Sequence, residues 1–258
     1  MSDPQEDVKL GILWPDDGSL TLNYELVQIE SRMESLRDSR LRVTVAFTKA
    51  KKTHTRADLL ATGNINELIP PARDLVACGC RALAWACTSG SFIGGFEWAR
   101  NQAASLEAAT GVPITSATLA MIEAAKELAA DRVDLLGAYP AEITNQFRQC
   151  LMEAGFSVVT VSALNCPTGS DSFHLNIIDA VKHFAIQHPQ RDYPLLIPDT
   201  AINTLNIHGE LGKIAGRDVI TANQATLWHG FKLLNRKLAL SEIGPLLWDQ
   251  EDCSPKDG

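Results

Sequence analysis

The sequence predicts an α/β protein of two pseudo-symmetric lobes, each built on a parallel sheet, with the functional site in the cleft between them. Three observations predict it. Short runs of β-favouring apolar residues alternate with helical patterns along the 258 residues, which is typical of α/β proteins. The runs do not alternate strictly between apolar and polar residues, as expected of strands that helices cover on both faces. The same order of strands and loops also occurs twice.

The elements can be assigned in order along the chain. In a first lobe, residues 1–115, apolar runs predict strands over 8–14, 41–47 and 82–86, and helical periodicity predicts helices over 22–37 and 92–108. A second lobe, residues 116–215, repeats this order. Its strands are predicted over 133–137, 157–161 and 194–197, and its helices over 116–129, 141–154 and 172–188. Gly155 is a helix stop signal.

The remaining C-terminal part is predicted to contain one more strand, over residues 218–221. We expect the segment 216–247 to pack back on the first lobe. The tail, residues 248–258, is expected to be disordered.

The composition argues against several classes of partner. The chain has a formal net charge of -8 and a pI near 5.2, which argues against binding to nucleic acid or anionic membranes. No apolar run is long enough to span a bilayer, and the stretch 1–7 is acidic and polar, unlike a secretory signal. We therefore expect a cytoplasmic protein whose 6 cysteines stay reduced. They lack the spaced pairs of a zinc site, so no metal is expected.

A cysteine at the end of a buried strand is the most informative feature of the chain. Cys87 follows the apolar run 82–86 and precedes Thr88, Ser89 and a helical pattern. Because a helix start favours negative charge, we expect the pKa of the Cys87 thiol to lie below that of a free cysteine. Thr88 and Ser89 could hold a carboxylate beside it. The competing interpretations are a buried structural thiol and hydroxyls that only cap a helix.

The internal repeat brings further polar side chains to the same cleft. Ligands of open α/β sheets bind outside the carboxyl ends of strands. Asp17, Tyr139, Asp199 and Thr200 follow predicted strands in this way. A buried carboxyl group of Asp199 facing Cys87 would have a raised pKa and could act as a general acid or base; the alternative is a helix N-cap. Tyr139 could donate its hydroxyl to a bound anion or simply cover a lobe edge.

Four stretches resemble a known family. They are Leu-Gly-Ile-Leu-Trp-Pro at 10–15, Cys-Thr-Ser-Gly-Ser at 87–91, the region from Gly-Val-Pro-Ile-Thr at 111–115 to Leu-Leu-Gly-Ala-Tyr-Pro at 135–140, and Thr-Ala-Asn-Gln-Ala-Thr-Leu-Trp at 221–228. The second and fourth are fairly specific. With them the chain resembles the aspartate/glutamate racemase superfamily, in the branch of maleate cis-trans isomerases and arylmalonate decarboxylases.

The resemblance implies two pseudo-symmetric lobes and carbon-acid chemistry beside carboxylates, without a metal or organic cofactor. Racemases of this superfamily use two cysteines on opposite faces of the substrate. Maleate isomerases use the first as a nucleophile on the double bond and the second as a proton donor, whereas arylmalonate decarboxylases keep only the second. Here Cys87 matches the first cysteine, and Asp199 stands where the second is expected.

The resemblance also assigns roles within the site. Cys87 becomes the nucleophile or base and Asp199 the opposing acid or base. The residues expected to bind the substrate are Asp17, Thr88, Ser89, Tyr139, Thr200 and Asn223.

The loop after the first strand bears on the choice of substrate. Asp16 and Asp17 would repel a doubly charged anion, more strongly in a dry cleft than in water. Either these side chains point away, as in a solvated turn, or the substrate carries an amine or amide, which favours an amino-acid derivative over maleate.

Together these observations predict a cofactor-independent isomerase acting on a small carboxylate, similar to maleate isomerase. The first alternative is a decarboxylase or racemase of a related malonate or amino-acid derivative, including the type that acts in ectoine breakdown. The second is a carboxylate-binding protein without turnover. The expected partner is the small carboxylate alone, and a homo-oligomer is compatible with the sequence.

Overall fold

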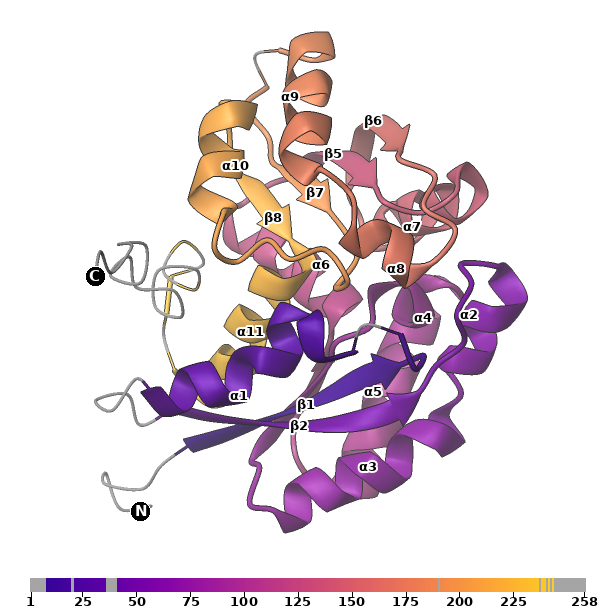
Figure 1. Ribbon diagram of the computed structural model, residues 1–258, viewed down its shortest axis with the longest axis vertical. Coiled ribbons are helices and arrows are strands. Elements are labelled where there is room, and N and C mark those ends of the chain that lie inside the picture. The colour runs from indigo at the N-terminus through magenta and orange to yellow at the C-terminus, as the bar shows by residue number, and fades with distance from the viewer. Residues whose placement is uncertain are drawn as a thin grey trace, which may run out of the picture.

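The chain forms two four-stranded parallel sheets in the computed structural model, which describes residues 8–19, 21–35, 41–189, 191–236, 238–239, 241 and 243. The first sheet has the order β2-β1-β3-β4 and the second β6-β5-β7-β8 (Figure 1). The two orders are equivalent, because the third strand of each set in sequence lies beside the first. The prediction of two pseudo-symmetric parallel-sheet lobes is therefore confirmed. The strands are β1 (Val8–Asp16), β2 (Leu41–Lys49), β3 (Ala82–Trp85), β4 (Ile114–Ser116), β5 (Arg132–Gly137), β6 (Ser157–Ala163), β7 (Leu195–Ile197) and β8 (Val219–Thr221).

Helices connect and cover these strands. They are the 3-10 helix η1 (Thr21–Asn23) and the α-helices α1 (Glu25–Ser35), α2 (Arg56–Thr62), α3 (Ile65–Ala77), α4 (Thr88–Phe92), α5 (Phe96–Thr110), α6 (Ala117–Glu127), α7 (Ala141–Glu153), α8 (Gly169–Phe173), α9 (Ile177–Gln187), α10 (His208–Ala215) and α11 (Ala222–Leu233).

The structure explains why apolar and polar residues do not alternate along the strands. Leu10 and Ile12 of β1 point into a core that both sheets share, whereas Leu13 packs with α3 and α5 on the outer face. In β7, Leu196 joins the shared core, and its neighbours Leu195 and Ile197 pack with α9 and α10. Because apolar side chains are buried on both faces, the strands are continuous apolar runs.

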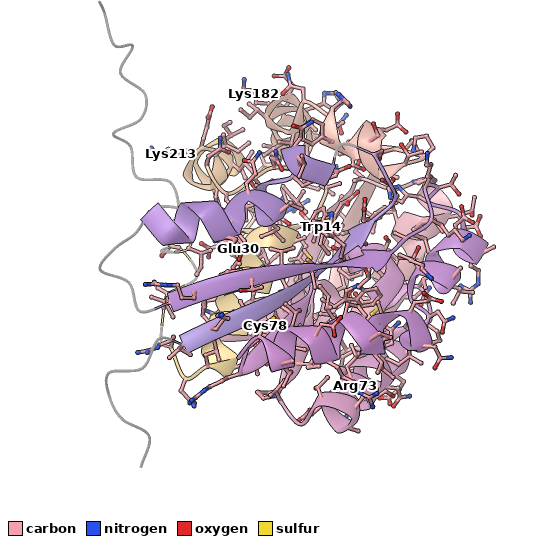
Figure 2. The ribbon with its side chains drawn as sticks, turned by 60° about the horizontal axis from the view of Figure 1, so that its bottom comes forward. Trp14, Glu30, Arg73, Cys78, Lys182 and Lys213 are labelled. Carbon is pink, nitrogen blue, oxygen red and sulfur yellow. The ribbon has the colours of Figure 1, made fainter. Side chains whose placement is uncertain are left out.

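The arrangement separates an apolar interior from a charged exterior. Figure 2 shows Trp14 in the interior, and its side chain is buried. The side chains of Arg73, Lys182 and Lys213 extend from the outside of the molecule. Within the described part of the chain, no helix has both the length and the apolar character needed to cross a membrane.

Several boundaries differ from the predicted ones. The expected helix 92–108 is divided into α4 and α5 by Gly94 and Gly95, and Gly95 has a φ of 90° that most residues avoid. The expected helix 172–188 is likewise divided into α8 and α9. β4 was not predicted, because Ile114 is its only strongly apolar residue, whereas the equally short β7 and β8 belong to recognisable apolar runs.

The C-terminal part contributes to both sheets rather than packing only on the first lobe. Within the predicted segment 216–247, β8 pairs with β7 and completes the second sheet. By contrast, α11 packs against β3 and β4 of the first sheet. The predicted tail, residues 248–258, lies outside the described residues.

Candidate active site

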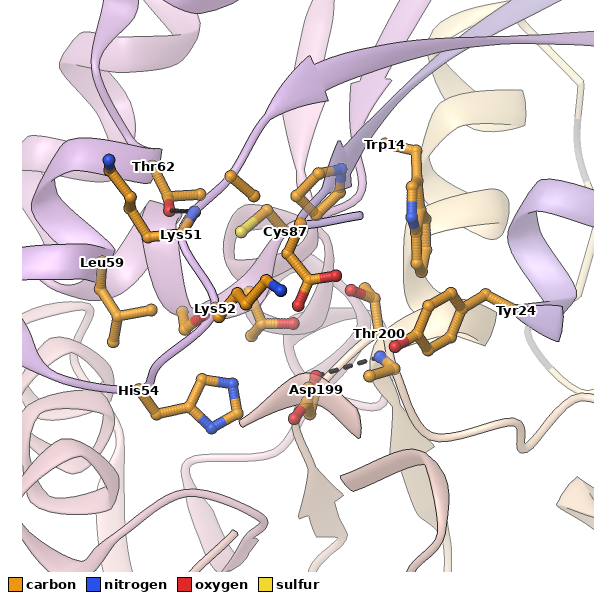
Figure 3. A pocket seen from close by; sticks show the side chains of 17 residues that line it. Trp14, Tyr24, Lys51, Lys52, His54, Leu59, Thr62, Cys87, Asp199 and Thr200 are labelled. Carbon is orange, nitrogen blue, oxygen red and sulfur yellow. Dashed lines mark hydrogen bonds between the residues drawn. The ribbon is translucent and has the colours of Figure 1, made fainter. Parts of the chain in front are cut away.

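A small cavity lies where the two sheets present the carboxyl ends of their strands (Figure 3). Its wall includes the ends of β1 and β2, the β3–α4 junction and the segment after β7. The free space is about 60 Å³, which is room for a few water molecules or one small substrate. Of the predicted site residues, the cavity wall includes Asp17, Cys87, Thr88, Ser89, Asp199 and Thr200.

Cys87 is held at the start of a very short helix. β3 ends at Trp85, and Cys87 is the N-cap of α4, which has five residues. Its side chain is 5% exposed, and burial raises the pKa of the Cys87 thiol to about 12. The N–H of Gly90 and the hydroxyl of Ser89 lower this pKa, but by less than desolvation raises it. The expectation of a readily ionised thiol is therefore wrong, because the loss of water around the sulfur outweighs the effect of the helix start.

The hydroxyl groups beside Cys87 have bonding capacity left for a ligand. Thr88 is buried, and its Oγ1 has no hydrogen-bond partner among the described residues. The N-cap position of α4 has no side-chain hydrogen bond either. Helix capping therefore does not use the Thr88 hydroxyl. A buried hydroxyl without a partner is costly, and a bound carboxylate would satisfy it.

Tyr139, which follows β5 of the second sheet, lies beside Thr88 and Ser89 but outside the cavity wall. The residue is fully buried, and its ring packs edge-on against His54 at 4.9 Å and Phe92 at 5.5 Å between centroids. Burial raises the pKa of Tyr139 well above its usual value, and the nearby charges of Asp199 and Cys87 add to this. Its hydroxyl oxygen has no hydrogen-bond partner within the described residues. Tyr139 is not part of the cavity wall, and it lies close enough to the hydroxyls of Thr88 and Ser89 for them to lower its pKa. The expectation that Tyr139 contacts the substrate is therefore not met, and its hydroxyl lies behind those of Thr88 and Ser89.

Asp199 occupies a strained turn opposite Cys87. Its φ is 99°, a region that costs a non-glycine residue about 1–3 kcal/mol and is found mostly at functional sites. One carboxylate oxygen, Oδ1, accepts the N–H of Ala201 at 3.0 Å, and the other, Oδ2, has no partner among the described residues. The next helix, α10, begins only at His208. Asp199 therefore closes a local turn instead of capping a helix and keeps one oxygen for chemistry.

Thr200 connects the two walls of the cavity. Its Oγ1 donates to the carbonyl oxygen of Ala86 at 2.9 Å, and both residues are buried. Ala86 directly precedes Cys87, so this bond fixes the spacing between the two predicted catalytic segments. The hydroxyl of Thr200 is thereby used within the protein, although the residue does line the cavity.

Opposite charges line the mouth of the cavity. Asp17 accepts hydrogen bonds from the N–H and the hydroxyl of Ser19, at 2.8 and 2.5 Å. Burial raises the pKa of Tyr24 to about 12, and the nearby negative charge of Asp17 adds to this increase. Lys51 and Lys52 belong to the same wall, and Figure 3 shows the amine of Lys52 directed toward the cavity. Sequence reasoning missed both lysines.

His54 is a further cavity residue that sequence reasoning left without a role. Its Nδ1 lies 2.9 Å from the carbonyl oxygen of Cys166, which makes Nδ1 the protonated nitrogen and leaves a lone pair on Nε2. Figure 3 shows one ring nitrogen directed toward the cavity and the other away from it. The signal was present, because His54 follows the carboxyl end of β2 and such ends form the site.

Asn223 was expected to bind the substrate, but its side chain does not reach the cavity. It is fully buried and is not part of the cavity wall. Its amide Nδ2 donates to Glu25 Oε1 at 2.5 Å and to the carbonyl oxygens of Thr200 at 3.2 Å and Ile202 at 3.0 Å. Asn223 therefore holds the segment after Asp199 rather than a substrate carboxylate.

Within the part of the chain that the structure describes, no three His, Cys, Asp or Glu side chains are grouped so that they could hold a metal ion.

The chain is similar to known proteins over most of its length. A family model described as arylmalonate decarboxylase matches residues 61–247. A maleate isomerase of Geobacillus stearothermophilus is 23% identical over 256 residues, which span 93% of this chain and 96% of the relative.

Solved structures show the same fold. A maleate cis-trans isomerase of Nocardia farcinica, solved as a cysteine-to-serine mutant with a covalently bound succinylcysteine intermediate, has a TM-score of 0.79 at 15% identity, covering 93% of this chain and 98% of that one. A maleate isomerase of Pseudomonas putida S16, solved with maleate, has a TM-score of 0.76 at 19% identity, with 88% and 92% covered. A liganded double mutant of arylmalonate decarboxylase has a TM-score of 0.75 at 19% identity, with 90% and 94% covered.

Proposed function

This chain belongs to the arylmalonate decarboxylase family, and from that premise we propose that it is a cofactor-independent isomerase acting on a small carboxylate. One observation carries the proposal. Cys87 and Asp199, which come from different sheets, line one small cavity in which the hydroxyl of Thr88 and one oxygen of Asp199 lack protein partners. A cytoplasmic location, where thiols stay reduced, suits the free cysteines among the described residues.

The reaction begins with the thiol of Cys87. Since burial raises its pKa to about 12, the thiol needs a base to become a nucleophile. The lone pair on Nε2 of His54 accepts the proton as the sulfur adds to the vinyl carbon of the substrate. The sulfur–carbon bond forms, and the electron pair of the double bond moves into the adjacent carboxylate as an enediolate. The succinylcysteine intermediate of the Nocardia farcinica isomerase supports this addition.

The reaction then proceeds through rotation and release. The carboxyl group of Asp199 gives its proton to the enediolate carbon and forms the saturated thioether, in which the former double bond is now single and turns. Asp199 then takes that proton back, the electron pair re-forms the double bond, and the sulfur–carbon bond breaks. The sulfur takes its proton back from His54. Donors at Thr88 and Ser89, which line the cavity, stabilise the enediolate, and one such donor typically changes a rate by ~10²–10³-fold.

Racemisation or decarboxylation is the second candidate, and the free Oδ2 of Asp199 favours it. With proton-transfer groups on both sides of a substrate, one removes the α-proton and the other supplies it from the opposite face. For a malonate, loss of carbon dioxide leaves an enediolate that a protonated Asp199 can protonate. Both reactions use the same anion-binding donors.

The charges at the cavity mouth suggest the class of carboxylate. Asp17 and Asp199 disfavour a dianion, whereas Lys52, whose amine points toward the cavity, attracts a carboxylate. A substrate with one carboxylate and an amine or amide suits both sets. For the isomerase we therefore rank an unsaturated monocarboxylate that carries an amine or amide above maleate. For racemisation or decarboxylation we rank amino-acid derivatives first.

A substrate panel observed by NMR in deuterated water tests these candidates. The panel contains maleate, arylmalonates, free amino acids and N-acyl amino acids. Cis-trans conversion identifies an isomerase, α-deuteration with inversion a racemase, and carbon dioxide release a decarboxylase. A ligand that raises the melting temperature equally in the wild type and the Cys87→Ser variant, with no product from any compound, would instead indicate a binding protein.

The His54→Gln variant tests the proton acceptor. Loss of a general base typically lowers turnover by ~10²–10⁴-fold. His183→Gln is the control, because His183 is exposed on α9. Equal turnover in both variants would remove His54 from the mechanism.

A further inference from the structure

The strained turn that carries Asp199 is held from behind by a buried carboxyl group of the other lobe. Glu25 is the first residue of α1, which packs against β2, and its side chain is 3% exposed. Its Oε1 accepts the N–H of Thr204 at 2.8 Å, and its Oε2 accepts the N–H of Leu205 at 3.0 Å. Both donors belong to the segment that follows Asp199. A residue 179 positions away in sequence thus supplies acceptors for that segment.

The contact between this segment and α1 is reciprocal. The backbone N–H of Glu25 donates to Oδ1 of Asn203 at 3.0 Å, and Nδ2 of Asn203 donates to the carbonyl oxygen of Asn23 at 3.1 Å. Asn203 therefore supplies a side-chain acceptor to the start of α1. The turn and the helix each satisfy backbone groups of the other.

Asn223 extends this network up to Asp199 itself. Its amide donates to Glu25 and to the carbonyl oxygens of Thr200 and Ile202. The hydroxyl of Thr204 also donates to Thr221 at 2.9 Å. The carbonyl oxygens on both sides of Ala201 are thereby fixed, and the N–H of Ala201 is the donor that holds Asp199 Oδ1.

A role in stability alone does not explain a carboxyl group here. Removing a carboxylate from water is costly, and apolar residues of similar volume often replace buried charged groups without loss of stability. A backbone turn with a non-glycine φ of 99° needs surroundings that hold it in place. The hydrogen bonds to Glu25 provide this at the position where orientation matters for chemistry.

We propose that Glu25 is a positioning residue, which holds the 199–205 turn through Asn223 and the N–H groups of Thr204 and Leu205 so that Asp199 faces Cys87. This inference rests on the proposed function for its catalytic consequence. Its structural part, order in the turn, is measurable without any substrate.

The experiment compares Glu25→Gln and Glu25→Leu with a matched control, Asp134→Asn. Asp134 is also a fully buried carboxylate, but it bonds to Arg217 and to the N–H of Thr160 in the second sheet, away from the cavity. The readouts are backbone hydrogen exchange in the peptides covering 199–205, thermal stability, and kcat and KM for the substrate found in the panel.

We expect exchange at Thr204 and Leu205, whose N–H groups donate to Glu25, to accelerate by roughly tenfold or more in Glu25→Leu and by less in Glu25→Gln; tenfold corresponds to one lost hydrogen bond. We expect kcat to fall by roughly 10–100-fold with little change in KM, because misplacement of a catalytic group has costs of this size. The Gln variant keeps one acceptor oxygen, so its exchange rate and its kcat should lie between those of the wild type and those of the Leu variant. The control should keep wild-type exchange in 199–205 and wild-type kcat.

Two results would overturn the inference: unchanged exchange in 199–205, or a kcat that falls only in proportion to thermal stability across all three variants. If the Leu variant does not fold, the Gln variant decides alone. Accelerated exchange with no turnover in the wild type would support the structural role and count against the proposed enzymatic function instead.

Discussion

Cys87 and Asp199 occupy equivalent places in the two halves of the molecule, but their backbone conformations differ. Each lies two residues after the third strand of its sheet, since β3 ends at Trp85 and β7 at Ile197. Cys87 has an ordinary extended backbone with a φ of -136°, whereas Asp199 has a φ of 99°. The first wall is thus formed by its own strand and helix, and the second depends on partners elsewhere in the chain.

The difference shows how one fold can build two unlike halves of a site. The Cys87 wall needs little support, because helix α4 starts there and Trp85 and Leu13 pack around it. The Asp199 wall is held by Glu25, by Asn223 and by the bond from Thr200 to Ala86. Changes in the first wall should therefore affect chemistry directly, and changes around the second should also act through position.

Replacement of the sulfur should have the largest effect. The Cys87→Ser variant should lose turnover by ~10⁴-fold or more, because a serine hydroxyl is a far weaker nucleophile and the residue acts as part of a unit. Steady-state kinetics measures this. Cys78→Ser is the control, since Cys78 is exposed and lies outside the cavity wall. Turnover within tenfold of wild type in the Cys87 variant would contradict a cysteine mechanism.

Removal of the Asp199 charge should have the next largest effect. Asn tolerates a positive φ, so Asp199→Asn should keep the turn while removing the proton-transfer group. We expect turnover to fall by ~10²–10⁴-fold, with wild-type hydrogen exchange in 199–205. Asp74→Asn, on the exposed side of α3, should change neither quantity. Full activity in Asp199→Asn would leave Asp199 with a purely structural role.

The contribution of Glu25 to the free energy of unfolding should depend on pH. Burial raises the pKa of Glu25 from 4.5 to about 7. A group with a raised pKa contributes its full stabilisation below the unfolded value and loses it as pH rises through the folded value. Between pH 4.5 and 7 the wild type should therefore lose about 3 kcal/mol of unfolding free energy relative to Glu25→Gln. Urea unfolding of both proteins across this range measures the difference, and parallel curves would show that the pKa of Glu25 is not raised.

The bond between the walls should have the smallest effect. Thr200→Val removes the hydrogen bond to Ala86 and should cost about 1 kcal/mol of stability, with a severalfold loss of kcat as Asp199 and Cys87 move apart. Thr226→Val is a matched control, because Thr226 is equally buried but donates within its own helix. It should lose similar stability without a change in kcat. An identical kcat in both variants would mean that the walls need no direct connection.

Local sequence predicted the parts of the site that depend on chain order. The strands were recognisable because they are buried on both faces, and Cys87, Asp199 and Asp17 follow the strand ends where ligands bind. The same rule would have identified His54 and Lys52 after β2. The predicted pKa direction of Cys87 was wrong because a motif does not show how completely the folded chain excludes water.

The support of Asp199 could not be predicted from the sequence. Glu25 is separated from Asn223 by 198 positions, and nothing near either residue indicates the other. The expectation that Asn223 binds substrate came from a motif that fixes its place in the fold but not the direction of its amide. Only the packing of α1 and α11 around the 199–205 turn shows that direction.

Peptide-resolved mass spectrometry of the Asp199→Asn variant, after incubation with the substrate panel, tests most directly whether Cys87 attacks a substrate held between the two walls. Impaired proton transfer should let an addition product accumulate, so we predict a mass increase equal to that of one substrate on the peptide containing Cys87. That increase should be absent after Cys87→Ser is added. Full turnover with no adduct at Cys87, or an adduct confined to another cysteine, would contradict the account.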